Sequence, residues 1–346
     1  MAEWIVAWKD EANIATSDGD DEPMIRAGRR ALLGTTLAMP ALAQPPAWPT
    51  RPVRVVVPFA GGGSSDIGAR LLTTKLTSLL GQPFVVENRA GAGGTTGTDY
   101  VAKSPPNGEI FAQSGLTPMA LALGLYRNLP YDPLKDLIGI APTSFVPLSI
   151  AINANVPARN AQEFIALLRA NPGRYFFGSA GVGTSGHVCS SNFLTQIGAK
   201  AEHVPFRGGA ELYLALQKGD VAFATDTPLV FKPMQDAGQV RIIFVATESR
   251  MPTLPDVPTA REIGLTNFRA HSWYGIYAPA GTPQPIIDRF AAGIEEALGD
   301  PALQQRFEEI GTPVMRGWTP ARFTDYLRDE IAFWVPLVRA SGAQAG

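Results

Sequence analysis

Short apolar runs alternate with amphipathic stretches along most of this chain. Residues 53–59 are mostly apolar and predict a strand, whereas residues 64–80 repeat apolar positions at the spacing of one helix face. Because this alternation is typical of βαβ units, it predicts an α/β protein with mixed, mostly parallel sheets. Further strands are expected at 84–86, 110–112, 148–152, 175–177, 203–205, 221–224, 240–246 and 273–278, and further helices at 161–170, 184–196, 210–217, 228–237, 285–298, 301–310 and 320–340.

Two comparable blocks of these units are followed by a long C-terminal helical stretch. The chain has 346 residues, which is enough for two domains with cores of their own. We therefore predict two lobes, with residues 44–147 and 270–346 in the first and residues 148–269 in the second. The C-terminal helices are expected to pack back on the first lobe.

The charge balance and the cysteine count exclude several classes of protein. The formal net charge is −2, so no basic field points to nucleic acid. Cys189 is the only cysteine, which excludes a disulfide framework and a cysteine zinc site. The three histidines, His187, His203 and His271, lack the spacing of a metal motif. We therefore predict no metal, no cofactor and no nucleic-acid partner.

The N-terminal region has the pattern of an export signal. A basic stretch that ends at Arg30 precedes the apolar residues 31–40, and a small-x-small pattern ends at Ala43. This order predicts a secretory signal that is cleaved after Ala43 and delivers the protein to the periplasm, with the Sec and Tat routes both open. Residues 1–23 are acidic and unsuited to export, so we expect translation to start at Met24. Residues 1–43 would then be absent from the mature protein.

Two glycine-rich turns, at residues 61–66 and 181–186, each follow an apolar run and open a helical pattern. A strand that leads through a glycine turn into a helix presents unpaired N–H groups at the positive end of the helix dipole. Two such turns can enclose one small anion from opposite sides, which favours a protein that holds a carboxylate over one that transforms it. The alternative for the first turn is a plain strand-to-helix connection, with Ser64 or Ser65 as the helix cap.

The second turn also allows an enzyme. Residues 181–186 match G-x-G-x-x-G, with Glu202 near the distance of a ribose-binding acid, but Glu202 would precede its strand. Ser185 and His187 suggest a hydrolase, yet they lie outside a G-x-S-x-G elbow and face different sides of a helix. An enzyme of the dinucleotide-binding or hydrolase type therefore remains the alternative function.

Seven segments occur in an order that resembles one family. They are WPTRPVRVVVPFAGGGSSDIGAR, VVENRAGAGGTTGTDYVAKSPPNG, LYRNLPYDPLKDL, GSAGVGTSGH, HVPFRGGAELYLALQKGDV, LPDVPTAREIG and SWYGIYAPAGTP. In this order the chain resembles the substrate-binding proteins of tripartite tricarboxylate transporters, the Bug family. The resemblance implies a two-lobed, type II-like periplasmic binding fold with a ligand cleft between the lobes.

The resemblance also implies which residues hold a carboxylate ligand. They are Phe59, Ala60, Gly61, Gly62, Ser64, Ser65 and Asp66 in the first turn, Ala180, Gly181, Gly183, Thr184, Ser185 and His187 in the second, and Asp226 near the variable end of the ligand. A carboxylate that backbone and hydroxyl donors satisfy needs no lysine or arginine. Asp66 either accepts N–H groups and holds its turn rigid, or meets an ammonium group on the ligand.

The sequence thus predicts a monomeric solute receptor that does not act as an enzyme. Its partners would be a small carboxylate and either the membrane subunits of a tripartite tricarboxylate-type transporter or a sensor kinase. Trp273 and Tyr274 are interpreted as packing residues of a strand between the lobes, not as ligand contacts.

Overall fold

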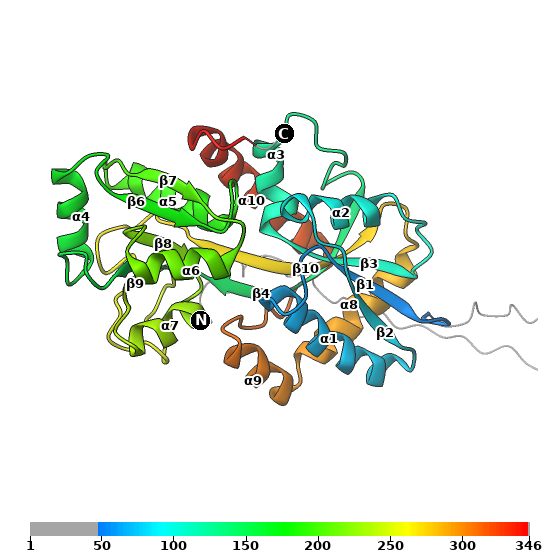
Figure 1. Ribbon diagram of the computed structural model, residues 1–346. Helices are drawn as coiled ribbons and strands as arrows, with labels where there is room; N and C mark the ends of the chain where they lie inside the picture. The colour runs from blue at the N-terminus through cyan, green and yellow to red at the C-terminus, as the bar shows by residue number, and fades with distance from the viewer. Residues whose placement is uncertain (1–47, 345–346) are drawn as a thin grey trace, which may run out of the picture. The chain divides into compact units, whose positions relative to one another are not determined.

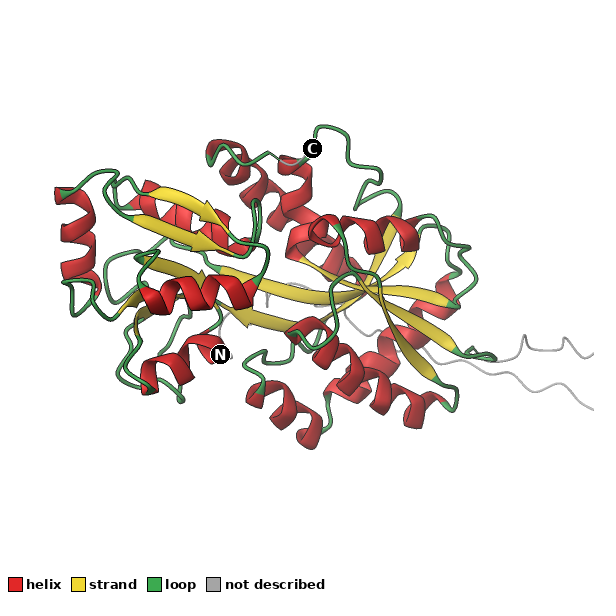
Figure 2. Ribbon diagram, viewed as in Figure 1, coloured by secondary structure: helices red, strands yellow, loops and turns green. Residues whose placement is uncertain are grey.

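The computed structural model describes residues 48–344, in which two sheets carry helices on both faces (Figure 1 and Figure 2). The predicted secretory signal, with its cleavage after Ala43, lies outside the described residues. Within the described part of the chain, every helix is too short or too polar to cross a bilayer.

The first sheet has five strands in the order β2-β1-β3-β10-β4. They are β1 (Val53–Val57), β2 (Phe84–Asn88), β3 (Ile110–Gly115), β4 (Leu137–Pro147) and β10 (His271–Pro279). β1 runs parallel to β2 and β3, whereas β10 is antiparallel to β3 and β4. The sheet is therefore mixed.

The second sheet has five strands in the order β7-β6-β8-β5-β9. They are β5 (Ser149–Asn153), β6 (Phe176–Ser179), β7 (Glu202–Pro205), β8 (Phe223–Asp226) and β9 (Val240–Val245). β6 is parallel to β7 and β8, whereas β5 is antiparallel to β8 and β9. This sheet is mixed as well.

The predicted mixed sheets are confirmed, but antiparallel pairs are as frequent as parallel ones, and the path of the chain explains the antiparallel pairs. β4 leads into β5 with only Leu148 between them, so this segment carries the chain from the first sheet to the second. β10 returns beside β4, with His271 opposite Pro147 (Figure 1). Two strands that cross in opposite directions must pair antiparallel.

β4 and one further helix are absent from the sequence expectation, as are the short helical segments within residues 117–125. β4 is buried on both faces and contains Gly139 and Pro142, so no alternation marks it as a strand. A register shift in its pairing with β10 accommodates the proline. Helix α2 (Thr95–Ala102), which follows one 3₁₀ turn, also lies outside the predicted elements.

The helices around the first sheet enclose two buried clusters. They are α1 (Ser64–Leu80), α8 (Gln284–Leu298) and α9 (Pro301–Glu309) on one face, and α2, the π-helical segment η3 (Thr117–Leu121), α3 (Ala122–Leu125) and α10 (Pro320–Ala340) on the other. Leu72, Phe111 and Phe290 belong to the first cluster, whereas Val56 and Phe323 belong to the second. The sheet thus buries apolar side chains on both faces.

The second sheet is covered in the same way. Its helices are α4 (Ala161–Ala170) and α5 (Ser185–Gln196) on one face and α6 (Gly209–Lys218) and α7 (Pro228–Asp236) on the other. Phe164, Phe193 and Phe223 share one cluster with residues of α10, whereas Leu212 and Phe231 belong to a separate one. The C-terminal helix therefore contacts α5 as well as the first sheet.

A buried carboxylate fixes α10 to the returning strand. Glu330 accepts hydrogen bonds from the indole N–H groups of Trp273 and Trp334 at 2.9 and 3.0 Å, and its Oε2 lies 3.0 Å from His271 Nε2. Burial acts to raise the pKa of Glu330, but His271 and the two indoles outweigh it and hold the pKa below its usual range.

The division into lobes at residues 147 and 270 remains a prediction, and the grouping of strands into two sheets supports it.

Candidate functional site

The first glycine-rich turn connects β1 to α1, and Asp66 ties it together. Asp66, the third residue of α1, accepts hydrogen bonds from the Gly62 N–H and the Asn88 amide at 2.9 Å each and from Arg70 Nε at 3.1 Å. Burial acts to raise the pKa of Asp66, but these hydrogen bonds and the Arg70 charge hold it below the usual range. Of the two roles predicted for Asp66, the contacts match the one that holds the turn rigid.

Three N–H groups remain unpaired at the start of α1. The helix cap is Gly63, which has no side chain to accept them, so neither Ser64 nor Ser65 is the cap. Among residues 48–344, no acceptor meets the N–H groups of Ser64, Ser65 and Asp66. An uncapped helix start of this kind suits an anion.

The second turn connects β6 to α5 and is held differently. Thr184 caps α5 by accepting the His187 N–H at 3.4 Å, and its hydroxyl donates to the Gly181 carbonyl at 2.9 Å. The Gly183 N–H donates to His187 Nδ1 at 3.0 Å. Gly181 and Gly183 have φ values of +139° and +75°, a backbone region that favours glycine. The N–H groups of Ser185 and of Gly186 beside it have no acceptor within the described part of the chain.

Tyr274 contacts the first turn, and the charge of Asp226 acts on it. The Ser64 hydroxyl lies 3.1 Å from the Tyr274 hydroxyl, and the Tyr274 ring meets Phe59 edge-on, with 6.5 Å between ring centroids. Burial raises the pKa of Tyr274, and the nearby Asp226 carboxylate raises it further. On the far side, Asp226 follows Thr225, whose carbonyl packs so closely on Gly186 that a Cβ there would approach it to 2.6 Å.

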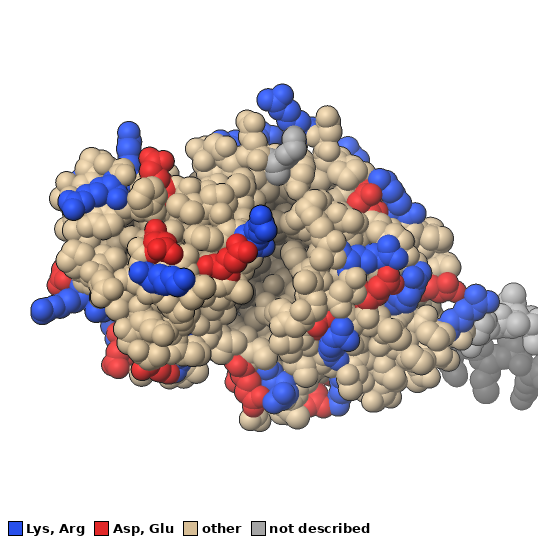
Figure 3. Space-filling view, viewed as in Figure 1, with Lys and Arg blue, Asp and Glu red and all other residues tan. Residues whose placement is uncertain are grey.

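Figure 3 shows a hollow in the middle of one face, between the side that carries α1 and the side that carries α6. Most atoms that line it belong to neither acidic nor basic residues, and charged side chains gather at its rim. We call this hollow the cleft. Its lining is consistent with a site that is built from neutral donors.

Asp226 lies at the end of β8, partly exposed. Its carboxylate accepts the Thr227 N–H at 2.7 Å and the Tyr213 hydroxyl at 2.9 Å. Burial raises its pKa, while these two hydrogen bonds act in the opposite direction. The carboxylate keeps unused lone pairs, so it can accept a hydrogen bond from a bound molecule.

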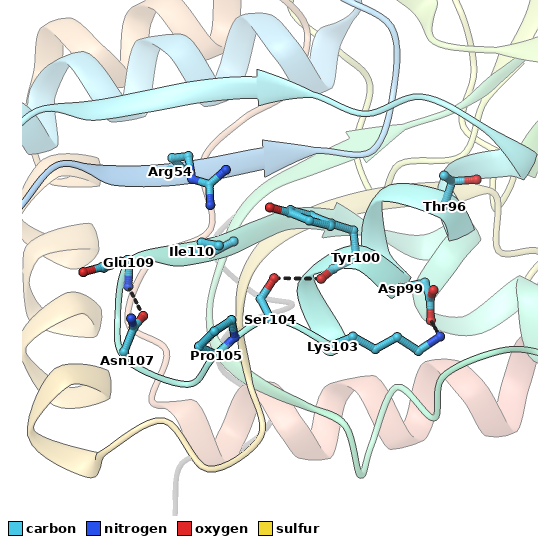
Figure 4. A pocket seen from close by; sticks show the side chains of 10 residues that line it. All are labelled: Arg54, Thr96, Asp99, Tyr100, Lys103, Ser104, Pro105, Asn107, Glu109 and Ile110. Carbon is cyan, nitrogen blue, oxygen red and sulfur yellow. Dashed lines mark hydrogen bonds and ion pairs between the residues drawn. The ribbon is translucent and has the colours of Figure 1, made fainter.

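A separate pocket of about 530 Å³ lies on the outer side of α2, β1 and β3 (Figure 4). It contains none of the predicted site residues. Asp99 and Lys103 pair with each other at 2.6 Å, and Asn107 accepts the Glu109 N–H, so its polar groups largely satisfy one another. Its shape and chemistry assign it no ligand.

The predicted site residues differ in their contacts and in their burial. Phe59 and Ser64 meet through Tyr274, and Ala60 and Gly61 lie exposed in the first turn. Ala180, Gly181, Thr184 and Ser185 are half-buried in the second turn, whereas Gly183 and His187 are buried. Of the four glycines predicted to meet a ligand, Gly62, Gly181 and Gly183 donate their N–H groups internally instead.

Sequence reasoning missed Tyr274, Tyr213 and His203. Successive strand residues point to opposite faces, so Trp273 and Tyr274 cannot share one role. Trp273 is buried against Glu330, as a packing residue should be, whereas Tyr274 reaches Ser64. That alternation is the signal that would have separated the two.

Comparisons with known proteins agree on one family. The model of the tripartite tricarboxylate transporter family receptor matches residues 68–342. Protein BugT of Bordetella pertussis is 34% identical over 320 residues, which cover 91% of this chain and 97% of BugT. The solved periplasmic binding protein BugD aligns with a TM-score of 0.75 and 30% identity over 86% of this chain and all of BugD. R. palustris Rpa4515, solved with adipate, aligns with a TM-score of 0.77 and 32% identity over 86% of this chain and all of Rpa4515.

Proposed function

The chain belongs to the tripartite tricarboxylate transporter receptor family, and we propose that it binds a small carboxylate between the starts of α1 and α5. One observation carries this proposal. Unpaired N–H groups open both helices, and a turn that glycines form precedes each of these openings. Apart from Tyr274 and Gly186, the residues involved are among those that the family resemblance implies, and Gly62, Asp66, Gly183 and His187 support the turns from within.

The chemistry of these donors suits a carboxylate. Hydrogen bonds from N–H groups to an ionised oxygen are stronger than neutral ones, and the dipoles of both helices add a favourable field. Arg70 is already paired with Asp66, so it does not provide a charge for the ligand. The ligand is therefore held by backbone and hydroxyl donors.

Asp226 sets the preference at the other end of the ligand. A second ionised carboxylate beside it would meet a like charge, whereas a hydroxyl or amine would donate a hydrogen bond to it. We therefore place a hydrogen-bond donor at the variable end of the preferred ligand.

The family and the geometry do not favour an enzyme that uses residues 181–186. His187 Nδ1 takes the Gly183 N–H, so that nitrogen is not available to activate Ser185. Glu202 is the first residue of β7, whereas a ribose-binding acid lies at the end of its strand. Neither a hydrolase nor a dinucleotide site has the required arrangement.

We propose that the receptor works as a monomer in the periplasm. The predicted secretory signal at residues 31–43 supports this location, as does the periplasmic relative BugD. It would deliver its ligand to the membrane subunits of a tripartite tricarboxylate-type transporter, or present it to a sensor kinase. The segments where β4 meets β5 and where β10 begins would act as the hinge for closure around the ligand.

A binding screen tests this function. Purified residues 44–346 are titrated by calorimetry and thermal shift with acids that differ only in their second group, each beside its neutral amide. A carboxylate at 100 times its Kd should stabilise the protein by about 2.7 kcal/mol. The amides should have no effect. If no carboxylate in the panel stabilises the protein, or amides bind as well as acids, the proposal is wrong.

A further inference from the structure

Two of the three histidines form a stacked pair behind the second turn. The rings of His187 and His203 lie 3.8 Å apart at an angle of 7°, and Phe177 stacks against His203 with its ring centroid 4.8 Å away. His187 comes from the first turn of α5, and His203 from β7, opposite Phe177 in the sheet. The pair thus connects the helix that opens at the turn to the sheet beneath it.

Hydrogen bonds assign the protons of both rings. Because the Gly183 N–H donates to His187 Nδ1, the proton of that ring is on Nε2. The Ser179 hydroxyl donates to the Gly181 carbonyl at 2.8 Å, so at the 2.7 Å contact between Ser179 Oγ and His203 Nε2 the histidine is the donor. Burial lowers the pKa of both rings to about 4, so both are neutral at pH 7, and each holds one end of the same turn.

We propose that His187 and His203 are positioning residues that hold residues 181–185 in the ligand-ready conformation before any ligand arrives. His187 fixes the Gly183 N–H, and His203 fixes Ser179, which in turn holds Gly181. With both ends fixed, the N–H groups of Ser185 and Gly186 stay directed away from internal acceptors. This inference rests on the proposed function, and it gives His187 a supporting role in place of the direct ligand contact that the resemblance implies.

The physical reason is preorganisation. Gly181 and Gly183 occupy backbone regions open to glycine, so the turn has other conformations available when nothing holds it. Ordering it at the moment of binding would reduce affinity. Gly183 is buried, so loss of its acceptor would also leave an unpaired N–H inside the protein.

Four crossed substitutions separate this role from simple packing. Asparagine places an oxygen where His Nδ1 lies, and glutamine places an N–H donor where Nε2 lies. His187→Asn therefore keeps the acceptor for Gly183 and His187→Gln loses it, whereas His203→Gln keeps the donor to Ser179 and His203→Asn loses it. All four remove the stacked rings equally, so a packing role predicts the same loss within each pair.

The measurements are amide hydrogen exchange at Gly183 without ligand, and the Kd for adipate and malate. We expect His187→Gln to lose the protection of Gly183 and to raise the Kd at least about tenfold over His187→Asn. His203→Asn should raise the Kd over His203→Gln in the same direction. Equal Kd values and equal exchange within both pairs would overturn the proposal.

The test still gives an answer if the polar variants unfold or if the wild type does not bind these acids. His187→Phe retains a stacking ring without an acceptor, so it replaces the polar variants if they unfold, and a Gly183 amide that stays protected in it contradicts the proposal. If the wild type binds neither adipate nor malate, these two acids are excluded as ligands of the proposed receptor. The exchange data then still decide the role of the histidines.

Discussion

The two glycine-rich turns share one local scheme but differ in chemistry. In each, the N–H of the residue two before the helix donates to the side chain of the third helix residue, from Gly62 to Asp66 at 2.9 Å and from Gly183 to His187 at 3.0 Å. The first turn uses a carboxylate that Arg70 neutralises. The second uses an imidazole that is neutral because it is buried against another ring.

The difference shows what the site requires of these side chains. Each must accept an N–H firmly without presenting a net negative charge to an incoming carboxylate. An aspartate achieves this only with a cation beside it, whereas a neutral histidine needs none. Both solutions leave the following N–H groups of the helix unpaired, and those groups are the proposed ligand donors.

We expect the largest effect from a substitution that disrupts the first turn. Asp66→Ala leaves the Gly62 N–H and the Arg70 guanidinium without their acceptor and should lower the free energy of unfolding by about 3 kcal/mol. Asp66→Asn keeps one acceptor oxygen and should lose clearly less. Urea denaturation measures both. Asp236→Ala, which breaks the exposed pair with Lys232, is the control and should cost less than about 0.5 kcal/mol. Equal losses in Asp66→Ala and Asp66→Asn would contradict the assigned role of this carboxylate.

The next largest effect is a difference between the two turns in how their contributions to stability depend on pH. Burial lowers the pKa of His187 to about 4, with the neighbouring His203 adding to the shift. The unfolded chain, with a histidine pKa of about 6.5, therefore binds more protons than the folded one between these values, so stability falls as the pH falls. His187 alone should remove about 2 kcal/mol of stability between pH 7 and pH 5.

Asp66 behaves differently in this range, because its pKa is lowered and its contribution persists until the pH falls below about 4. Urea denaturation at pH 7 and pH 5, on the wild type and on the His187→Asn, His203→Gln double variant, measures the contrast. The double variant should lose much less stability than the wild type. A loss of the same size in both would place the pH dependence elsewhere.

The regular elements followed from sequence where local signals agree. Helices at 64–80, 161–170 and 320–340 begin and end where predicted, because apolar spacing, a cap such as Asn160 and a terminating glycine such as Gly81 coincide there. β4 was missed because it is buried on both faces and carries Pro142. Parallel pairing was overpredicted because strand direction depends on how the chain crosses between sheets, which no local pattern encodes.

The candidate site, too, could be predicted from sequence only where its signals are local. The turns could be found because glycines, hydroxyl residues and a following helix are adjacent in sequence. The contact between Ser64 and Tyr274 joins residues 210 positions apart, and only the fold brings them together. The supporting role of the third helix residue has a local signal, a glycine four residues before an aspartate or a histidine, which we expect to be informative in other turns of this type.

A smaller effect tests whether the unpaired N–H groups of the two turns are equivalent. Ser64 and Ser185 are first residues of their helices, where proline is tolerated, and Gly63 and Thr184 before them are already extended. Ser64→Pro and Ser185→Pro therefore remove one N–H donor each with little effect on folding. Each should raise the Kd about tenfold over the matched Ser→Ala variant, which removes only the hydroxyl. Calorimetry measures the four values. If proline and alanine variants bind equally, the N–H groups do not contact the ligand.

The smallest effect concerns Asp226, a partly exposed acidic group at the end of β8 for which no cation partner lies among residues 48–344. Adipate and 6-hydroxyhexanoate differ only in whether the second end is a carboxylate or a hydroxyl. The wild type should prefer the hydroxyl, because the carboxylate meets a like charge at Asp226. Asp226→Asn removes that charge and should shift the ratio of the two Kd values about threefold to tenfold toward adipate. Asp236→Asn on α7 makes the same change in net charge at an exposed pair with Lys232 and should leave the ratio unchanged. A ratio that is the same in Asp226→Asn as in the wild type would mean that the variable end of the ligand lies elsewhere, and the preference would then have to come from the turns themselves.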